Sequence, residues 1–319
     1  MISIVGHVDA HLSTVAHEYR MLSEWPELSA LIRKTATNNT YLRIPEAVAA
    51  SINTSGHITG AAVVAIACLQ LSLAIIDDIL DDELIGFHVD HGVGPAVNAG
   101  YVLQTLGQHA LLHCTVPYAQ RVAALELYQA TTLTVALAQN VDLHPCLSES
   151  RYWEICHAKS GAFFGFVMAI CATLAGWQPG SYILYKLGAL YGEIVQIQDD
   201  LQDALEMPAA SDWFGGGGSL PLVFAATVPH AERDRFAILR KQVSDVHQLK
   251  EAQNILFRSG AVSYGLHQII CRHQRATDLI AQLAGANRPP LERIFHELTL
   301  PVRNVLACVG EGPAYTCHV

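Results

Sequence analysis

The chain has 319 residues, of which 51% are hydrophobic and 15% are charged, and its formal net charge is -10. That much apolar material can bury a large core, and nothing in the composition indicates disorder. The acidic balance and the lack of a lysine-rich stripe argue against a nucleic-acid-binding surface.

Apolar residues recur mainly at intervals of three and four, which predicts helices and almost no strands. No long polar linker divides the chain and no repeat of fixed period occurs, so we expect one all-α domain over residues 1–319. Short breaks between the helices are expected at 38–40, 55–57, 86–95, 144–145, 178–181, 208–220 and 287–290.

The longest apolar stretch, residues 61–76, runs directly into carboxylates. It is a turn or more short of the roughly 20 residues that span a bilayer. The N-terminal residues carry scattered His, Asp and Glu where a signal peptide would be continuously apolar. We therefore expect a buried helix here and no transmembrane segment.

The cysteines show neither CxxC pairing nor the density of a disulfide scaffold, which indicates buried thiols in a reducing compartment and predicts a cytoplasmic protein. There are eight, at positions 68, 114, 146, 156, 171, 271, 308 and 317.

A first acidic motif closes an apolar helical run in "LSLAIIDDILDDELI", residues 71–85. Side chains four apart stack on one helix face, so the pattern places Asp77 over Asp81 and Asp78 over Asp82. A second motif ends "YGEIVQIQDDLQDALE", residues 191–206, where Asp199 lies over Asp203 and Asp200 is adjacent.

The clustered carboxylates need countercharge, because two unit charges about 4 Å apart repel by about 4 kcal/mol at an effective dielectric constant near 20. Oxygen-only ligands suit Mg²⁺, which commonly completes its shell with substrate phosphate oxygens. A single such motif could be a solvated acidic helix end. Two of them together predict a metal-bridged diphosphate site.

With both motifs in place, the chain resembles the trans-isoprenyl diphosphate synthase and class I terpene synthase superfamily. "DDILDD" and "QIQDDLQD" look like the two aspartate-rich motifs of that superfamily, and "AQNVDL", "HAKSGAFF", "SLPLVFA" and "RSGAVSYG" extend the likeness over about residues 40–265. The resemblance implies a single-domain all-α bundle, with both motifs facing across the mouth of a central apolar cavity. It also implies a homodimer and about three bound Mg²⁺ ions.

The sequence departs from the chain-elongating members at three cationic positions. "NNTYLRIPEA" keeps Arg43 but has Asn39 and Thr40 where that subgroup has glycine and lysine. His88 and His91 replace an arginine pair, and glycine replaces a lysine in "DWFGGGGSLPL". Each lost charge-assisted contact is worth roughly 1.5 to 3 kcal/mol, so binding of isopentenyl diphosphate should be weak.

We therefore expect a class I terpene cyclase, a carbon–oxygen lyase that ionises one allylic prenyl diphosphate of roughly C15 to C25 and releases a terpene. Lys159 and Gln196 are expected to contact the substrate. The expected metal ligands are Asp77, Asp81 and Asp199, with Asp78, Asp82, Asp200 and Asp203 in supporting roles.

The apolar walls of the expected cavity include aromatic side chains that stabilise a carbocation, among them Phe163, Phe164, Trp153 and Tyr191. At helical spacing such aromatics are more often plain core, so we expect about half of these four to line the site. By the same resemblance, Ser72 and Leu73 lie at the floor of the cavity, and the small Ser72 leaves room for a long chain.

Two alternatives remain open at this stage. The first is a prenyltransferase, which either elongates with isopentenyl diphosphate or transfers the prenyl group to a non-diphosphate acceptor. The second is a non-catalytic partner subunit, although both acidic motifs are intact. "GVGPAVNAG" and "GGGG" lack the residues of nucleotide-binding loops, and the latter is expected to be a turn or lid. The sequence suggests no role for the 16 histidines.

Overall fold

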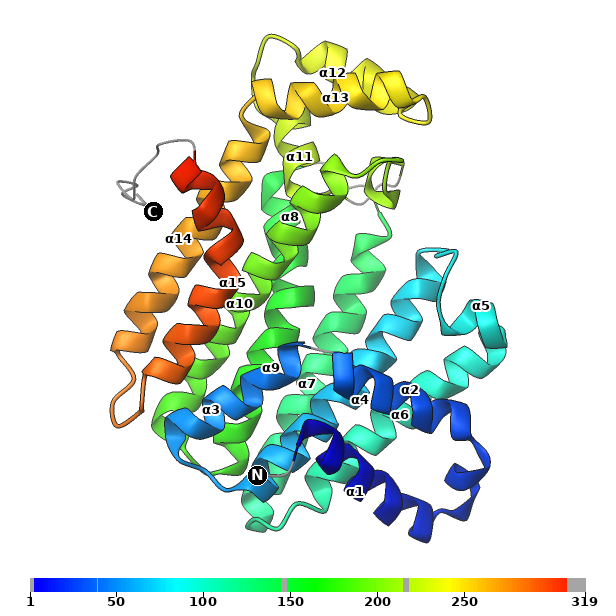
Figure 1. Ribbon diagram of the computed structural model, residues 1–319, viewed down its shortest axis with the longest axis vertical. Coiled ribbons are helices and arrows are strands. Elements are labelled where there is room, and N and C mark those ends of the chain that lie inside the picture. Colours follow the sequence, from blue (N-terminus) through cyan, green and yellow to red (C-terminus); the bar gives the residue numbers. More distant parts are fainter. Residues whose placement is uncertain (1–2, 39, 145–147, 215–217, 309–319) are drawn as a thin grey trace. The chain divides into compact units, whose positions relative to one another are not determined.

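The computed structural model describes residues 3–38, 40–144, 148–214 and 218–308, and every regular element among them is a helix (Figure 1). The predicted all-α class is confirmed. The α-helices are α1 (Ile4–Glu18), α2 (Pro26–Asn38), α3 (Ile44–Ile52), α4 (Gly56–Leu80), α5 (Phe87–His91), α6 (Val93–Leu112), α7 (Tyr118–Asp142), α8 (Glu149–Cys156), α9 (Ala162–Leu174), α10 (Gln178–Leu205), α11 (Leu220–Thr227), α12 (Arg233–Leu239), α13 (Val246–Arg258), α14 (Ala261–Ala281) and α15 (Pro289–Cys308).

Five short helical segments complete the secondary structure. Four are 3₁₀ turns and η3 is a π-helix. They are η1 (Arg20–Glu24), η2 (Thr40–Arg43), η3 (His157–Gly161), η4 (Ser211–Trp213) and η5 (Arg240–Gln242).

The chain separates into two compact units. Unit 1 comprises Met1–Leu133, Gly165–Lys186 and Leu283–Leu291. Unit 2 comprises Thr134–Phe164, Leu187–Gln282 and Glu292–Val319. The first acidic motif belongs to unit 1 and the second to unit 2. That residues 1–319 form one domain stays a prediction.

In unit 1, α4 is apolar around its whole circumference, which is the composition of a helix buried on all sides. It packs against α6. The Ser72 hydroxyl donates to the Gly100 carbonyl at 3.1 Å, and a ring nitrogen of His57 lies 3.2 Å from the Thr115 carbonyl. His57, in the first turn of α4, contacts a residue just after the end of α6, whereas Ser72, further along α4, contacts Gly100 in the first half of α6. The two helices are therefore antiparallel.

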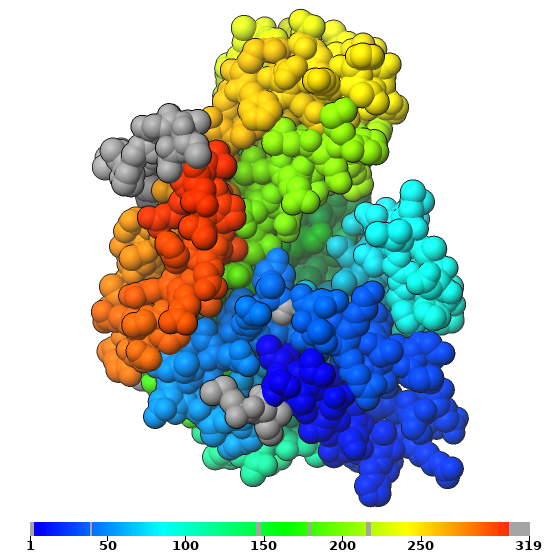
Figure 2. Space-filling model, in the orientation of Figure 1, coloured from blue at the N-terminus to red at the C-terminus, as the bar shows by residue number. Residues whose placement is uncertain are grey.

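The N-terminal helices α1 and α2 pack on each other and on α4 (blue in Figure 2). Their apolar faces bury Val8, Leu12 and Leu28. An ion pair joins Arg33 Nε to Asp9 Oδ1 at 2.6 Å, with both side chains about half exposed. Burial of the apolar faces therefore contributes more to this packing than the surface ion pair does.

Among the residues that the structure describes, two segments are long and apolar enough to span a membrane, Gly56–Leu80 and Glu149–Leu174. In each, 78% of the most apolar window is buried inside the protein. Buried core helices of soluble proteins also meet these criteria of length and hydropathy. The expected absence of a transmembrane segment therefore stays a prediction.

The described cysteines largely match the expected buried thiols. Cys68, Cys114, Cys156 and Cys171 are free and buried. Cys271 differs, because it is disulfide-bonded. The expectation that every cysteine is a thiol is wrong at this position.

Two predicted breaks contain ordered structure. The 86–95 segment forms α5 and the first turn of α6. The 208–220 segment contains η4, whose Trp213 is only 2% exposed and packs in the core of unit 2 beside Phe236 of α12. Most of the "GGGG" sequence, residues 215–217, lies outside the described residues.

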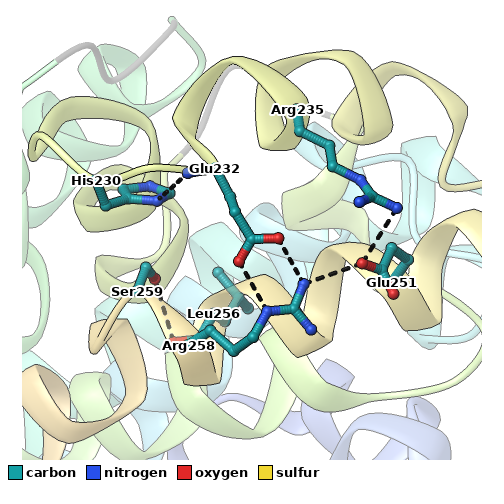
Figure 3. A network of polar contacts seen from close by, with 7 residues as sticks. All are labelled: His230, Glu232, Arg235, Glu251, Leu256, Arg258 and Ser259. Carbon is teal, nitrogen blue, oxygen red and sulfur yellow. Dashed lines mark hydrogen bonds and ion pairs between the residues drawn. The ribbon is translucent and has the colours of Figure 1, made fainter.

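A charged network joins the start of α12 to the end of α13 in unit 2 (Figure 3). The Arg258 guanidinium donates to both carboxylate oxygens of Glu232, at 2.7 and 2.8 Å, and to Glu251 Oε1 at 2.9 Å. Arg235 reaches the same Glu251 oxygen at 3.3 Å. The Arg258 guanidinium lowers the pKa of Glu232, so this network keeps its charges at neutral pH.

Truncating Phe236 to Ala should lower the free energy of unfolding by about 3–5 kcal/mol, because its fully buried ring fills the core of unit 2. Ile238→Ala, on the same helix at a side chain 60% exposed, should change it by less than about 1 kcal/mol. Urea unfolding followed by tryptophan fluorescence measures both. Equal effects of the two changes would contradict this packing.

Candidate active site

The first acidic motif lies where α4 ends. The helix stops at Leu80, and Asp81 caps it by donating its N–H to the Asp77 carbonyl at 2.9 Å. Asp82 has a φ of 51°, in the left-handed region that Asp tolerates better than most residues. The predicted helical stacking of Asp78 over Asp82 is therefore wrong, whereas Asp77 and Asp81 remain one turn apart.

The helix ends here for an electrostatic reason. Four aspartates at the carboxyl end of a helix meet the negative pole of its dipole and also repel one another. Leaving the helix at Asp82 separates that carboxylate from the turn that carries Asp77 and Asp78.

Gly86 brings the next segment over Asp78. Its φ is 142°, and a Cβ at this position would lie 2.8 Å from Asp78 Oδ2, so no other residue fits without displacing the carboxylate. Burial and the neighbouring Asp77 raise the pKa of Asp78, partly offset by His88. The positive charge near Asp78 therefore does not fully compensate the negative charge of its carboxylate.

The histidines that replace the expected arginine pair lie on α5. A ring nitrogen of His88 is 3.0 Å from the Glu83 carbonyl, and the His91 ring packs on Phe87 with centroids 4.2 Å apart. These contacts hold the loop that follows the motif. His88 also supplies the favourable electrostatic interaction with Asp78.

The predicted floor residues differ in their surroundings. Ser72 is completely buried and its hydroxyl is bonded to α6, so its small size lets α6 approach α4 closely. Leu73 is partly exposed. That either residue sets the length of a bound chain stays a prediction.

The second motif lies near the end of α10. Asp199 is exposed, yet partial desolvation and the nearby Asp203 carboxylate raise its pKa to about 6. Asp203, one turn further along the same helix, is partly buried. The predicted stacking of Asp199 over Asp203 is confirmed, and these two carboxylates repel each other.

Asp200 has a different environment and is only 3% exposed. Its Oδ1 accepts from Gln196 Nε2 at 2.9 Å, and its Oδ2 accepts from the Leu220 backbone N–H at 2.8 Å. Burial raises its pKa to about 7 in spite of both hydrogen bonds. Because both oxygens are occupied, this placement favours the supporting role for Asp200 and makes it an anchor for the first turn of α11.

The π-helix η3 brings Ser160 to Gln196. The Ser160 hydroxyl donates to Gln196 Oε1 at 2.6 Å, so Ser160, Gln196, Asp200 and the start of α11 form one hydrogen-bonded chain. A Cβ on Gly192 would lie 2.2 Å from the Ser160 carbonyl oxygen. Glycine at this position therefore permits the close contact of η3 with α10, and such π-helical turns are frequent at functional sites.

Lys159 also lies on η3. Its Nζ is 2.6 Å from Asp142 Oδ2, and the two side chains are 20% and 27% exposed. The structure thus pairs the lysine that was predicted to contact the substrate with an acid from the "AQNVDL" segment.

Three of the four predicted aromatic residues, Phe163, Phe164 and Tyr191, form a buried group in unit 2. Phe163 and Phe164 pack edge to face, Phe164 contacts Tyr191, and Tyr191 contacts Phe295. Phe163, Phe164 and Tyr191 are each at most 8% exposed. They are core residues, and a contact of Phe163 with substrate stays a prediction.

Sequence reasoning missed one buried ionic group. Arg272 Nε donates to Glu193 Oε2 at 2.6 Å, His157 contacts Glu193 Oε1 at 3.1 Å, and the Arg272 guanidinium stacks 3.9 Å from the Trp153 ring centroid. Hydrogen bonds and charge from His157 and Arg272 lower the pKa of Glu193 despite its burial. The one available signal was an arginine within the apolar pattern of α14.

Arg43 is exposed at the end of η2 in unit 1. The same segment borders an open groove of about 400 Å³. Its lining includes Lys34 of α2, together with Leu31, Thr35, Asn38, Thr40 and Tyr41. Asn39, one of the residues that replace the expected glycine and lysine, lies outside the described residues.

Comparison with known proteins identifies the family. The family model described as polyprenyl synthetase matches residues 41–256. Geranylgeranyl pyrophosphate synthase D of Phomopsis amygdali is 24% identical over 231 residues, a match that covers 67% of this chain and 54% of that relative. The chain thus spans about half the length of this relative.

Solved structures share the fold. Geranylgeranyl pyrophosphate synthase from Lactobacillus brevis has a TM-score of 0.76 at 22% identity, covering 92% of this chain and 95% of its own. Decaprenyl diphosphate synthase from Rhodobacter capsulatus has a TM-score of 0.77 at 14% identity, covering 93% and 96%.

These matches overturn the expected enzyme class. The named relatives are prenyl diphosphate synthases, which transfer prenyl groups, so the expectation of a terpene cyclase or carbon–oxygen lyase is wrong. The error came from treating the loss of three cationic positions as the loss of the second substrate. The recognised superfamily and its all-α fold are confirmed, and the chain belongs to the polyprenyl synthetase family.

Proposed function

We propose that this protein is a Mg²⁺-dependent prenyltransferase that extends an allylic prenyl diphosphate by reaction with isopentenyl diphosphate. The observation that carries the proposal is the family match, which runs through both intact acidic motifs from residue 41 to residue 256. The names of the matched relatives support elongation over transfer to another acceptor.

The carboxylates of both motifs fit Mg²⁺. They offer only oxygen donors, and the raised pKa values of Asp78 and Asp199 indicate that their negative charge lacks compensation. Asp77, Asp81, Asp199 and Asp203 would hold the ions, with Asp78, Asp82 and Asp200 in support. Bound Mg²⁺ would neutralise the charge that develops on the departing diphosphate. Whether both motifs serve one diphosphate stays a prediction.

The protein's own residues position the groups around this chemistry. The Ser160–Gln196–Asp200 chain fixes the helix that carries Asp199 against η3, which carries Lys159. Lys159 is restrained by Asp142 and would contact the diphosphate as a point charge. Apolar side chains around the reacting carbons would keep water from the cation.

The second diphosphate needs positive charge, which the sequence lacks at the usual positions. Lys34 supplies it in this proposal, because it lines the 400 Å³ groove together with the hydroxyl and amide side chains of Thr35, Asn38 and Thr40. Arg43, at the end of the same segment, would be a second cation. We thus place the isopentenyl diphosphate in this groove of unit 1.

The family resemblance leads us to expect a homodimer. The cysteine usage leads us to expect a cytoplasmic location, and the acidic net charge leads us to expect no binding of nucleic acid.

Purified protein with Mg²⁺, a C10, C15 or C20 allylic diphosphate and isopentenyl diphosphate should yield a longer prenyl diphosphate. Mass spectrometry of the dephosphorylated products measures it. Asp77→Ala or Asp199→Ala should lower kcat/KM by roughly a hundredfold or more, since each removes a metal ligand. A terpene formed from the allylic substrate alone, or full activity in both variants, would contradict the proposal.

Lys34→Gln should raise KM for isopentenyl diphosphate by roughly 10- to 100-fold, because one charge-assisted contact of about 1.5 to 3 kcal/mol is lost. KM for the allylic substrate should stay unchanged. Lys34→Arg should keep most of the affinity, and Lys241→Gln is the control for a surface lysine outside the groove. An unchanged KM in Lys34→Gln would place the second substrate elsewhere.

The contribution of Asp199 and Asp200 to the stability of the metal-free protein should fall as pH rises from about 4 to about 7. The pKa values of Asp199, about 6, and Asp200, about 7, exceed the ordinary value near 4, so in this window these two groups bind more protons in the folded state than in the unfolded state. Asp200 contributes at most about 1.4 kcal/mol per pH unit, and the exposed Asp199 contributes less because solvent screens its interactions.

Thermal unfolding in chelator at several pH values tests this dependence. Asp200→Asn should remove its falling contribution, so the stability of this variant should decline less, or rise more, with pH than that of the unmodified protein. Asp234→Asn, on the exposed face of α12, should leave the pH dependence unchanged. The same slope in Asp200→Asn as in the unmodified protein would show that Asp200 has no raised pKa.

A further inference from the structure

Histidines and a glutamate meet where α1 and α6 end in unit 1, far along α6 from the acidic motif. One ligand atom from each of Glu18, His109 and His113 lies within 4.8 Å of the others. The His11 ring is adjacent, with its centroid 5.3 Å from that of His109. We call these four residues the histidine cluster.

Hydrogen bonds orient the rings for coordination. The Nδ1 of His113 is 3.0 Å from the His109 carbonyl, and because a carbonyl only accepts, Nδ1 carries the proton. The lone pair of His113 is then on Nε2. An imidazole held through its other nitrogen by a backbone carbonyl is the usual arrangement of a metal-binding histidine.

Two buried ring nitrogens in the cluster, Nε2 of His11 and Nδ1 of His109, have no hydrogen-bond partner among the described residues. An ion bound to Nε2 of His109 would leave both of them unpaired, so they are not evidence for the ion. His109 and His113 also stack with centroids 3.9 Å apart, so protonating both would place two like charges in contact.

The electrostatic environment favours the neutral imidazole at one ligand, His109, and at His11, which packs beside the ligands without being one. Burial, followed by the proximity of His109, lowers the pKa of His11 to about 4. Burial, followed by the proximity of His113, also lowers the pKa of His109, although Glu18 partly opposes it. Neutral imidazole is the form that ligates metals.

We propose that Glu18, His109 and His113 form a Zn²⁺ site that fastens the end of α1 to the end of α6, with His11 packed beside it. Two imidazoles and one carboxylate match the ligand preference of Zn²⁺, whereas the oxygen-only acidic motifs match Mg²⁺. The 3.4 Å between His109 Nε2 and Glu18 Oε2 is already close to the separation of two ligands in a tetrahedral site with bonds of about 2.0–2.1 Å. Because the two rings stack, the His113 side chain must rotate for its Nε2 lone pair to converge with that of His109.

This site is separate from the acidic motif. The contact of Ser72 with Gly100 aligns the two antiparallel helices. Asp77 lies five residues past Ser72, and His109 lies nine residues past Gly100 in the opposite direction. At about 1.5 Å per residue, the two sites are roughly 20 Å apart. A Zn²⁺ ion here would be structural and would not take part in prenyl transfer.

Zn²⁺ titration in saturating Mg²⁺, which occupies the carboxylate motifs, tests the proposal. Calorimetry and metal analysis after dialysis should give one tightly bound Zn²⁺ per chain and a higher Tm for the bound protein. Glu18→Gln and His113→Gln should each weaken binding at least tenfold and abolish the Tm increase. Both side chains are exposed, so both variants should fold, which circular dichroism checks.

His247→Gln, an exposed histidine on α13, should bind Zn²⁺ as the unmodified protein does. Prenyl-transfer activity should be unchanged in His113→Gln, and the visible absorption of bound Co²⁺ should change in that variant. Equal Zn²⁺ affinity in the unmodified protein and both cluster variants would overturn the site. The site would also be overturned if the unmodified protein bound Zn²⁺ only at millimolar or higher concentrations.

Discussion

Repulsion between carboxylates at the ends of two apolar helices is the constraint on which the rest of this structure depends. The pKa values of Asp78, Asp199 and Asp200 are all raised, so the protein holds negative charge in places where water does not fully stabilise it. Such groups are costly to fold around without cations. Gly86 and the hydrogen-bonded chain from Ser160 to Asp200 restrain the carboxylates, and this restraint would lower the free-energy cost of binding the Mg²⁺ ions that we propose.

The sequence predicted the elements that carry these groups, because apolar spacing and aspartate spacing are local properties. It failed where competing local forces are nearly balanced, as at Asp82, which leaves the helix that the spacing alone would continue. The π-helix η3 gave no signal, since no spacing rule distinguishes the sequence HAKSG in a π-helical turn from the same residues in an α-helical turn. Pairing of Arg272 with Glu193 joins residues that are distant in sequence, and no spacing rule finds it.

The wrong enzyme class has a related physical cause. A bound diphosphate requires positive charge in a volume of space, and any neighbouring helix can provide it. Thr40 lacks the expected charge, but Lys34 lines the same groove from the last turns of α2. A comparison of residue types position by position detects the loss at Thr40 and does not register Lys34, the cation that we propose as its replacement. The histidine cluster shows the same limitation, because Glu18 and His109 are 91 residues apart.

Diffraction from crystals grown with Mn²⁺ and diphosphate, recorded at the manganese absorption edge, would test the central claim most directly. Mn²⁺ replaces Mg²⁺ at oxygen ligands and is located by its anomalous signal. We expect manganese bound to Asp77 and Asp81 and also to Asp199, with diphosphate oxygens completing each coordination shell. Manganese absent from the carboxylates of either motif would contradict the proposal that these acidic helix ends are metal sites.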